Sequence, residues 1–171
     1  MGLDISYYKS WKPYDGEVKD WDHAEEIQMA GTDLEHIYNG AGFEGRAKGI
    51  PEWVVTSGAS GGFRAGSYGG YNRFRSLLCQ ALHGFPVGQL WAMSDNEQQE
   101  YDMWQMLHFS DCEGTLGTAV CKELHEAFER NWDKVMAFFT KEGDAEYYQV
   151  KLEEWRTAFK VAAGEGLIRF H

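Results

Sequence analysis

Leu3-Asp4-Ile5-Ser6-Tyr7-Tyr8-Lys9 is the segment from which the fold class follows, because apolar and polar side chains alternate along most of it. Leu3, Ile5 and Tyr7 fall on one side, as in a strand that is buried on one face. The last residues, Leu167-Ile168-Arg169-Phe170-His171, are also strand-like. Segments with helical periodicity lie between these two ends. We therefore expect a single α+β domain over residues 1–171, in which a small sheet containing both termini packs against about three to four helices.

Three of these helices can be placed from their apolar spacing. The first is expected to run from about Tyr71 to His83 and to end at Gly84, a residue type that favours helix C-termini. Two longer stripes, each followed by a turn or by glycines, predict the other two helices. Their apolar members are Val120, Leu124, Phe128, Trp132, Val135 and Phe139 in one, and Tyr148, Leu152, Trp155, Phe159 and Ala162 in the other.

Composition excludes several classes of protein. A chain of 171 residues with 43% hydrophobic and 15% aromatic residues is too apolar to be disordered. It has no run of 18 apolar residues and no basic leader before an apolar core, so we expect a cytoplasmic protein with no membrane partner. Its three cysteines predict free thiols. The net charge of −11 argues against binding to a nucleic acid polymer, for which a basic face is typical.

The most unusual run, Ser57–Gly70, contains six glycines in fourteen residues. We expect a short strand over Glu52–Thr56 that ends at Ser57-Gly58, then a glycine loop that leads into the first helix. The run lies within the window from Trp53 to Ser94, which contains no Asp or Glu but three arginines. This window therefore carries a charge of +3, which leaves −14 for the rest of the chain.

A glycine loop before a helix, together with arginines, suits an anionic ligand. Backbone N–H groups, the positive end of a helix and guanidinium groups all bind phosphate, while aromatic rings stack on nucleobases. We expect at most one of Arg73 and Arg75 to lie deep in such a site, because they are two positions apart on a helix, and we expect it to be Arg73. The alternative is a structural turn with Tyr71 and Phe74 in the core. The candidate ligand-binding residues of this segment are Phe63, Arg64, Ser67, Tyr68, Tyr71, Asn72, Arg73 and Arg75.

A second motif, His108-Phe-Ser-Asp-Cys-Glu-Gly-Thr-Leu-Gly117, also precedes a predicted helix. Ser110, Asp111 and Glu113 are candidates to accept hydrogen bonds from the sugar or base of a ligand, on the opposite wall of the same pocket. Alternatively, Ser110 and Glu113 form a capping box and have a structural role.

Two chemical alternatives involve the same motif. His108, Asp111 and Glu113 could hold a divalent metal, although their spacing matches no strong metal motif, so no metal or cofactor is predicted. Cys112 could be a nucleophile with His108, His125 or His171 as its base. His171 would reach the pocket if the last strand paired beside Leu3–Lys9.

Two runs, Gly62-Phe-Arg-Ala-Gly-Ser-Tyr-Gly-Gly-Tyr-Asn-Arg-Phe-Arg75 and Phe109-Ser-Asp-Cys-Glu-Gly-Thr-Leu-Gly117, resemble a family of small, largely uncharacterised phage and bacterial proteins. The opening Met-Gly-Leu-Asp-Ile and the ending Phe170-His171 are similar as well. The chain departs from the family at Thr118, where proline is usual. The resemblance implies a phage or prophage setting and little chemistry.

These observations predict a phage-type binding protein. It would sequester a phosphorylated, nucleotide-like small molecule, such as a cyclic oligonucleotide or an ADP-ribose derivative that signals in host defence. We expect binding without turnover, in the host cytoplasm and as a homo-oligomer. One alternative is a nucleotide phosphodiesterase or hydrolase that uses Asp111 and Glu113 with a metal, or Cys112. Another is an acidic inhibitor of a host protein.

Overall fold

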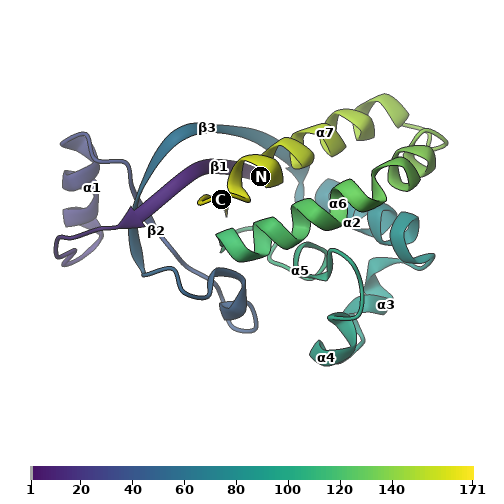
Figure 1. Ribbon diagram of the computed structural model, residues 1–171, viewed down its shortest axis with the longest axis horizontal. Helices are drawn as coiled ribbons and strands as arrows, with labels where there is room; N and C mark the ends of the chain where they lie inside the picture. Colours follow the sequence, from purple (N-terminus) through teal and green to yellow (C-terminus); the bar gives the residue numbers. More distant parts are fainter. Residues whose placement is uncertain (1) are drawn as a thin grey trace.

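The computed structural model describes residues 2–171, apart from the side chain of Ala59. The described residues form one five-stranded sheet, seven α-helices and one 3-10 helix, so the predicted α+β class is confirmed (Figure 1). The strands are β1 (Gly2–Pro13), β2 (Leu34–His36), β3 (Trp53–Ser67), β4 (Gly114–Leu116) and β5 (Leu167–Phe170). The helices are α1 (Trp21–Met29), η1 (Glu44–Ala47), α2 (Tyr68–His83), α3 (Val87–Trp91), α4 (Asp95–Gln98), α5 (Trp104–Leu107), α6 (Thr118–Phe139) and α7 (Ala145–Ala162).

The sheet has the strand order β2-β3-β1-β5-β4, and all of its strand pairs are antiparallel. Strand β5 pairs with β1, with Phe170 opposite Ile5 and Leu167 opposite Tyr8. The backbones of Asp4 and His171 exchange two further hydrogen bonds, of 2.8 and 3.0 Å. The prediction that both ends of the chain meet in one sheet is therefore confirmed, including the pairing of the last strand with the Leu3–Lys9 segment.

The prediction of a glycine loop over Ser57–Gly70 is wrong, because β3 continues through this run to Ser67 and α2 begins at Tyr68. Glycines occur within this strand because atoms of β1 occupy the space that a Cβ atom would fill. A Cβ atom on Gly61 would lie 2.4 Å from the hydroxyl of Tyr7. Gly58 and Gly66 have φ of 82° and 126°, and each lies at a register shift between β1 and β3, where a bulge needs a residue that accepts positive φ.

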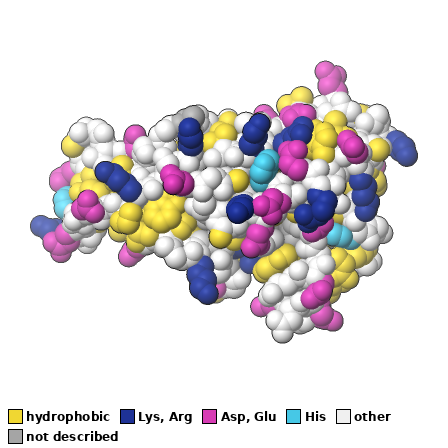
Figure 2. All heavy atoms as spheres, viewed as in Figure 1, with side chains coloured by type: hydrophobic (Ala, Val, Ile, Leu, Met, Phe, Trp, Pro, Cys, Tyr) yellow, Lys and Arg dark blue, Asp and Glu magenta, His cyan; other side chains and the backbone are white. Residues whose placement is uncertain are grey.

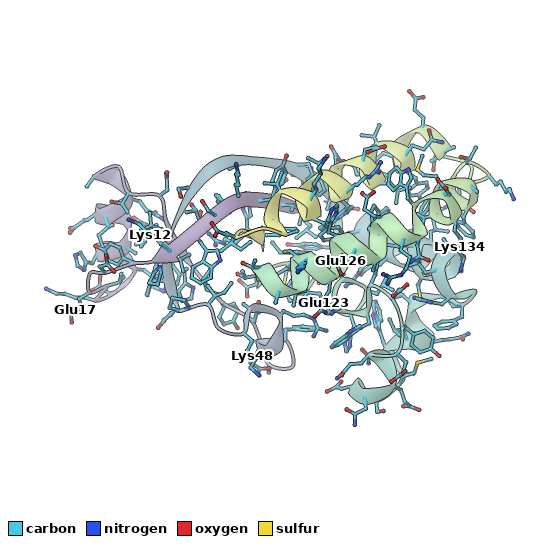
Figure 3. The ribbon with its side chains drawn as sticks, in the orientation of Figure 1. Lys12, Glu17, Lys48, Glu123, Glu126 and Lys134 are labelled. Carbon is cyan, nitrogen blue, oxygen red and sulfur yellow. The ribbon has the colours of Figure 1, made fainter. Side chains whose placement is uncertain are left out.

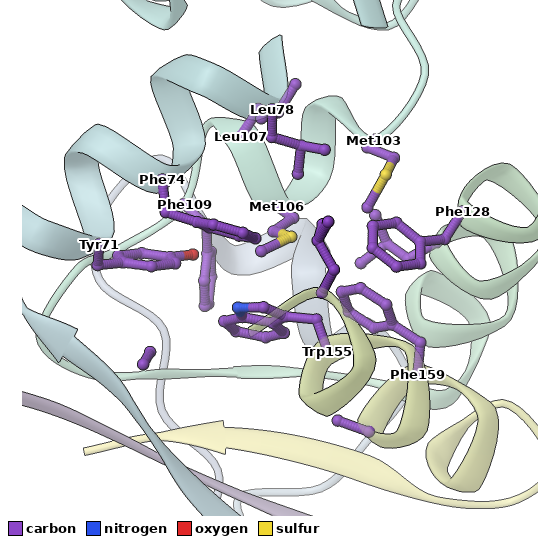
Figure 4. Packing of buried hydrophobic residues seen from close by; sticks show 14 of the residues in the cluster. Tyr71, Phe74, Leu78, Met103, Met106, Leu107, Phe109, Phe128, Trp155 and Phe159 are labelled. Atoms are coloured by element: carbon purple, nitrogen blue, oxygen red, sulfur yellow. The ribbon is translucent and has the colours of Figure 1, made fainter. Parts of the chain in front are cut away.

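Helices α2, α6 and α7 cover one face of the sheet and enclose the main core (Figure 1). Leu3, Ile5 and Phe170 of the sheet are buried against them, and Figure 4 shows Trp155 at the centre of this layer. Most of the two predicted helical stripes is buried, as expected. Glu123 and Glu126 lie on the solvent side of α6 (Figure 3). No described helix is both long and apolar enough to cross a membrane.

Strands β1 and β3 extend beyond the helical layer, and α1 and β2 lie at their far end (Figure 1). The sheet curls there, so that β2 comes close to β1 and β5. Glu35 of β2 accepts a hydrogen bond of 2.6 Å from the hydroxyl of Tyr8 in β1, and its other oxygen is paired with Arg169 of β5. The face of the sheet opposite the main core is therefore partly enclosed.

Candidate functional site

A pocket of about 460 Å³ lies beside β4 and β5, where the curled sheet meets the segment from α1 to β2. We name it the aromatic pocket. Three parts of the chain that are far apart in sequence meet in it. Its lining residues are Trp21, His36, Tyr38, Cys112, Glu113, Gly114, Thr115, Arg169, Phe170 and His171.

The floor of the pocket comes from neighbouring strands. Arg169 lies opposite Ser6 of β1 and Thr115 of β4, so these three residues share the face of the sheet that points away from the main core. Arg169 donates from Nη1 to Glu35. A guanidinium group has five N–H donors, so an ion pair through one nitrogen leaves others able to bind a ligand. The ring of His171 is fixed by a hydrogen bond of 2.8 Å between Nε2 and the hydroxyl of Ser6.

A second group of lining residues is aromatic. The rings of His36 and Tyr38 are stacked, with centroids 6.3 Å apart and an angle of 16° between their planes. Trp21 meets the His36 ring edge-on at 4.8 Å, and Trp53 supports His36 from another side at 4.7 Å. Trp21 and Tyr38 are 63% and 46% exposed. Large rings that are held by neighbours yet open to solvent offer a flat surface on which a planar ligand can stack.

The second motif forms the third side. The hydroxyl of Ser110 accepts hydrogen bonds from the N–H groups of Cys112 and Glu113, at 3.3 and 3.1 Å. Ser110 therefore stabilises this turn, but the capping box of the structural alternative is not formed in the described residues, because no helix begins until Thr118. Gly114 has φ of 142°, which turns the chain into β4. Glu113 and the Cys112 thiol are exposed in this turn and line the pocket.

The structure brings the two sequence motifs into contact, but through a buried cluster rather than through a cavity. Arg75 is 3% exposed and donates a hydrogen bond of 2.6 Å to the carbonyl of Phe109 and another to the amide oxygen of Asn72. Asn72 in turn donates to Asp111 at 2.9 Å. The Arg75 guanidinium also lies over the rings of Tyr71 and Trp91, at 4.6 and 5.1 Å. These polar groups hold the motifs together.

The three arginines of the acid-free window do not converge. Arg64 is exposed and pairs with Asp4 at 3.3 Å. Arg73 is exposed and Arg75 is buried, so the expectation that Arg73 would be the deeper of the two is wrong. The apolar face of α2 places position 75 toward α3 and the second motif, whereas position 73 points outward.

The other candidates from the glycine-rich run lie apart from the aromatic pocket. Tyr71 is fully buried in the core, stacked on Trp155 at 5.9 Å, which matches the structural alternative (Figure 4). Phe63 meets Trp155 edge-on at 5.1 Å on the helical side of the sheet. Ser67 caps α2 by accepting a hydrogen bond of 3.0 Å from Gly70, and Tyr68 is exposed at the start of that helix.

The metal and nucleophile alternatives differ in their geometric support. His108 faces Gln98, Asp111 faces Asn72 and Glu113 faces the pocket, and residues 2–171 contain no group of three or more His, Cys, Asp or Glu side chains placed to hold a metal ion. Of the histidines considered as a base for Cys112, only His171 lines the same pocket, within the part of the chain that the structure describes.

Of the ten lining residues, only Cys112, Glu113 and His171 are candidates from the sequence. The side chains that the sequence did not indicate are those of Trp21, His36, Tyr38, Thr115, Arg169 and Phe170. In the sequence, His36 and Tyr38 are two positions apart, as residues on one face of a strand are. Arg169 is a polar residue between apolar neighbours. Nothing local indicates that these residues face one another, because only the curl of the sheet brings them together.

No protein family, no curated protein and no solved structure matches this chain. The resemblance to phage and bacterial proteins stays a prediction.

Proposed function

We propose that the protein binds a phosphorylated, nucleotide-like small molecule in the aromatic pocket and sequesters it without turnover. The observation that carries the proposal is the composition of the lining, which puts exposed aromatic side chains, an arginine and a histidine in one pocket. A nucleobase would stack on Trp21 and Tyr38. The phosphate of the same ligand would accept hydrogen bonds from the free guanidinium N–H groups of Arg169 and from His171. The Glu113 carboxylate would accept hydrogen bonds from ribose hydroxyls or base amines.

The biological setting that we propose rests on the resemblance to phage and bacterial proteins. A host cytoplasm in which nucleotide messengers activate defence would be the place of action, and a homo-oligomer would be the acting form. Cyclic oligonucleotides and ADP-ribose derivatives are the ligand classes that fit this setting and combine rings with phosphates.

A thermal-shift titration with cyclic dinucleotides, cyclic trinucleotides and ADP-ribose tests the proposal. A ligand at 100 times its Kd stabilises the folded state by about 2.7 kcal/mol, which is a rise in Tm of about 5–10 °C for a chain of this size. The matching nucleosides, which lack phosphate, should give smaller shifts. If no compound in the panel changes the Tm, the proposal is wrong.

Point variants locate the site. Tyr38→Ala removes an exposed ring and should weaken binding about tenfold or more, because stacking on one ring contributes about 1–3 kcal/mol. Tyr68→Ala is the matched control, since Tyr68 is also exposed but lies at the start of α2, away from the pocket. If Tyr68→Ala loses affinity and Tyr38→Ala does not, the ligand binds at the glycine-rich run and not in the aromatic pocket.

A second candidate function is a reaction of the same ligand with Cys112. The observation in its favour is that this exposed thiol shares the pocket with His171, an imidazole that could accept its proton. A binder returns the ligand intact after the complex is denatured, whereas an enzyme returns product. If product forms and the Cys112→Ser variant forms none, the function is catalysis by Cys112 rather than sequestration.

A further inference from the structure

The outer edge of β3 is unpaired over most of its length. Strand β2 covers only Trp53–Val55, and one more backbone hydrogen bond, of 2.9 Å from Thr56 to Asp33, extends this cover. From Ser57 to Ser67, no described strand lies on the side of β3 away from β1. Figure 1 shows β3 as an arch on the outer side of β1. An edge of this kind presents N–H and C=O groups that another strand can pair with.

Exposed apolar side chains flank this free edge. Val150 of α7 is 52% exposed and borders a hollow together with Gly62 and Phe63 of β3, and this hollow extends to Tyr7 of β1 and Met136 of α6. Tyr147 of α7 is 45% exposed, and a Cβ atom on Gly66 would lie 3.3 Å from its hydroxyl. Tyr68, at 36%, follows the last residue of the strand. Apolar groups next to an unpaired edge are typical of a protein–protein contact surface.

Several charges beside the edge are paired within one molecule. Lys151 pairs with Glu154 at 2.7 Å and also donates to the carbonyl of Arg64, while Arg64 pairs with Asp4. Glu153, which borders the same hollow, lies 3.8 Å from Arg156, whose nearer partner is Glu129 at 2.6 Å. Strand β3 itself contains no carboxylate, in a chain whose net charge is −11. Two copies can therefore approach at this edge without the repulsion that two acidic surfaces would cause.

We infer that the free edge of β3 is a homodimer interface, in which residues 60–64 pair in an antiparallel manner with the same residues of a second copy. The Arg64 carbonyl, which accepts from Lys151, has a second lone pair for this pairing. A twofold axis makes such a surface complementary to itself, because β3 then meets β3 and α7 meets α7. The small side chains of Ser60, Gly61 and Gly62 let the two backbones come within hydrogen-bond distance. The two sheets would join into one, and Tyr147 and Val150 of both copies would be buried beside the joint. The contact does not involve the aromatic pocket.

Sedimentation of the full chain over a wide concentration range, compared between two charge variants, tests this inference. The unsubstituted protein should reach twice the mass of the chain. Val150→Glu places a charge beside the edge and should raise the dimer dissociation constant about tenfold or more. Met29→Glu is the matched control, because Met29 is 85% exposed on α1, at the far end of the molecule, and the same charge there should leave the dimer unchanged. Both positions are exposed, so both variants should fold.

Deuterium exchange then shows whether the edge itself pairs. The amides of residues 60–64 should exchange more slowly in the dimer than in Val150→Glu at the same concentration. A protein that stays monomeric at every concentration, or a dimer that Val150→Glu leaves intact, would overturn the inference. So would slow exchange at another surface with no change in β3.

Discussion

Arg75 is the side chain that joins the two sequence motifs. It is buried, and its hydrogen bonds end on the Phe109 carbonyl and on Asn72. Arg75→Ala should lower the free energy of unfolding by about 3 kcal/mol, because it leaves a buried carbonyl without a donor and removes two cation–π contacts. Urea denaturation measures the change. Arg73→Ala, two positions away and exposed, should change stability by less than about 0.5 kcal/mol. Equal effects of the two variants would contradict the buried cluster.

We expect His83 and His108 to make the protein sensitive to mild acid. Burial lowers the pKa of both imidazoles, and the charge of Arg46 lowers that of His108 further. The unfolded chain therefore binds protons at a higher pH than the folded chain does. Stability from this source is complete above about pH 6.5, the ordinary pKa of histidine, and is lost as the pH falls toward the lower pKa values of the folded state.

The double variant His83→Gln/His108→Gln tests this pH dependence, because an amide keeps a donor but does not titrate. Chemical denaturation at several pH values should show a smaller loss of stability from pH 7 to pH 5 than in the unsubstituted protein. An unchanged slope would mean that other groups cause the acid sensitivity.

At the scale of the element, the turn from α7 into β5 depends on one glycine. A Cβ atom on Gly166 would lie 1.9 Å from the backbone oxygen of Tyr8 and 2.8 Å from the Cα atom of Ala162. Gly166→Ala should therefore cost about 4 kcal/mol or prevent folding, since neither backbone atom can move away easily. Gly164→Ala is the control, because nothing lies within 4 Å of that position. Thermal unfolding of the two variants should separate them clearly, and similar Tm values would count against the close approach of α7 to β1.

The elements also show what could be predicted from the sequence. Apolar periodicity placed α2, α6 and α7, and the alternation at both ends placed β1 and β5, because each pattern reports a face that packs against the core. The same rules failed for β3. Glycines normally indicate a loop, but in β3 they accept positive φ at bulges and make room for Tyr7, which are requirements of the neighbouring strand rather than of the local sequence.

Thr118 shows a similar dependence on partners at the start of α6. Its hydroxyl accepts a hydrogen bond of 3.1 Å from the Trp11 ring and donates one of 2.6 Å to the Gly166 carbonyl. A proline at this position would make neither bond. Thr118 therefore links β1, α6 and the turn before β5, a role that its place in the sequence does not reveal.

At the scale of the whole molecule, the candidate site arises from the curl of the sheet. Glu35 binds Tyr8 and Arg169 across the curl, and the aromatic residues of segment 21–38 line one pocket with segments 112–115 and 169–171. The sequence indicated the second motif and its possible approach to His171, but not the aromatic residues. Long-range closure of this kind depends on the relative positions of strands, which no local pattern encodes.

The distribution of charged side chains over the molecule does not indicate a ligand site either. On the face shown in Figure 2, Lys and Arg side chains are interspersed with Asp and Glu. The acid-free window of the sequence is divided between the free β3 edge, the buried Arg75 cluster and exposed Arg73, so its charge is not collected in one place. The exposed rings of Trp21 and Tyr38 line the same pocket as Arg169, and they indicate a ligand site more specifically than the charge distribution does.

Native mass spectrometry of the full chain, mixed with cyclic oligonucleotides and ADP-ribose, tests the central claim most directly. We predict a complex with one of these compounds that is retained in Tyr68→Ala, is strongly reduced in Trp21→Ala and Tyr38→Ala, and releases the compound unchanged on denaturation. Absence of any complex, or a complex that both pocket variants retain in full, would contradict a ligand site in the aromatic pocket.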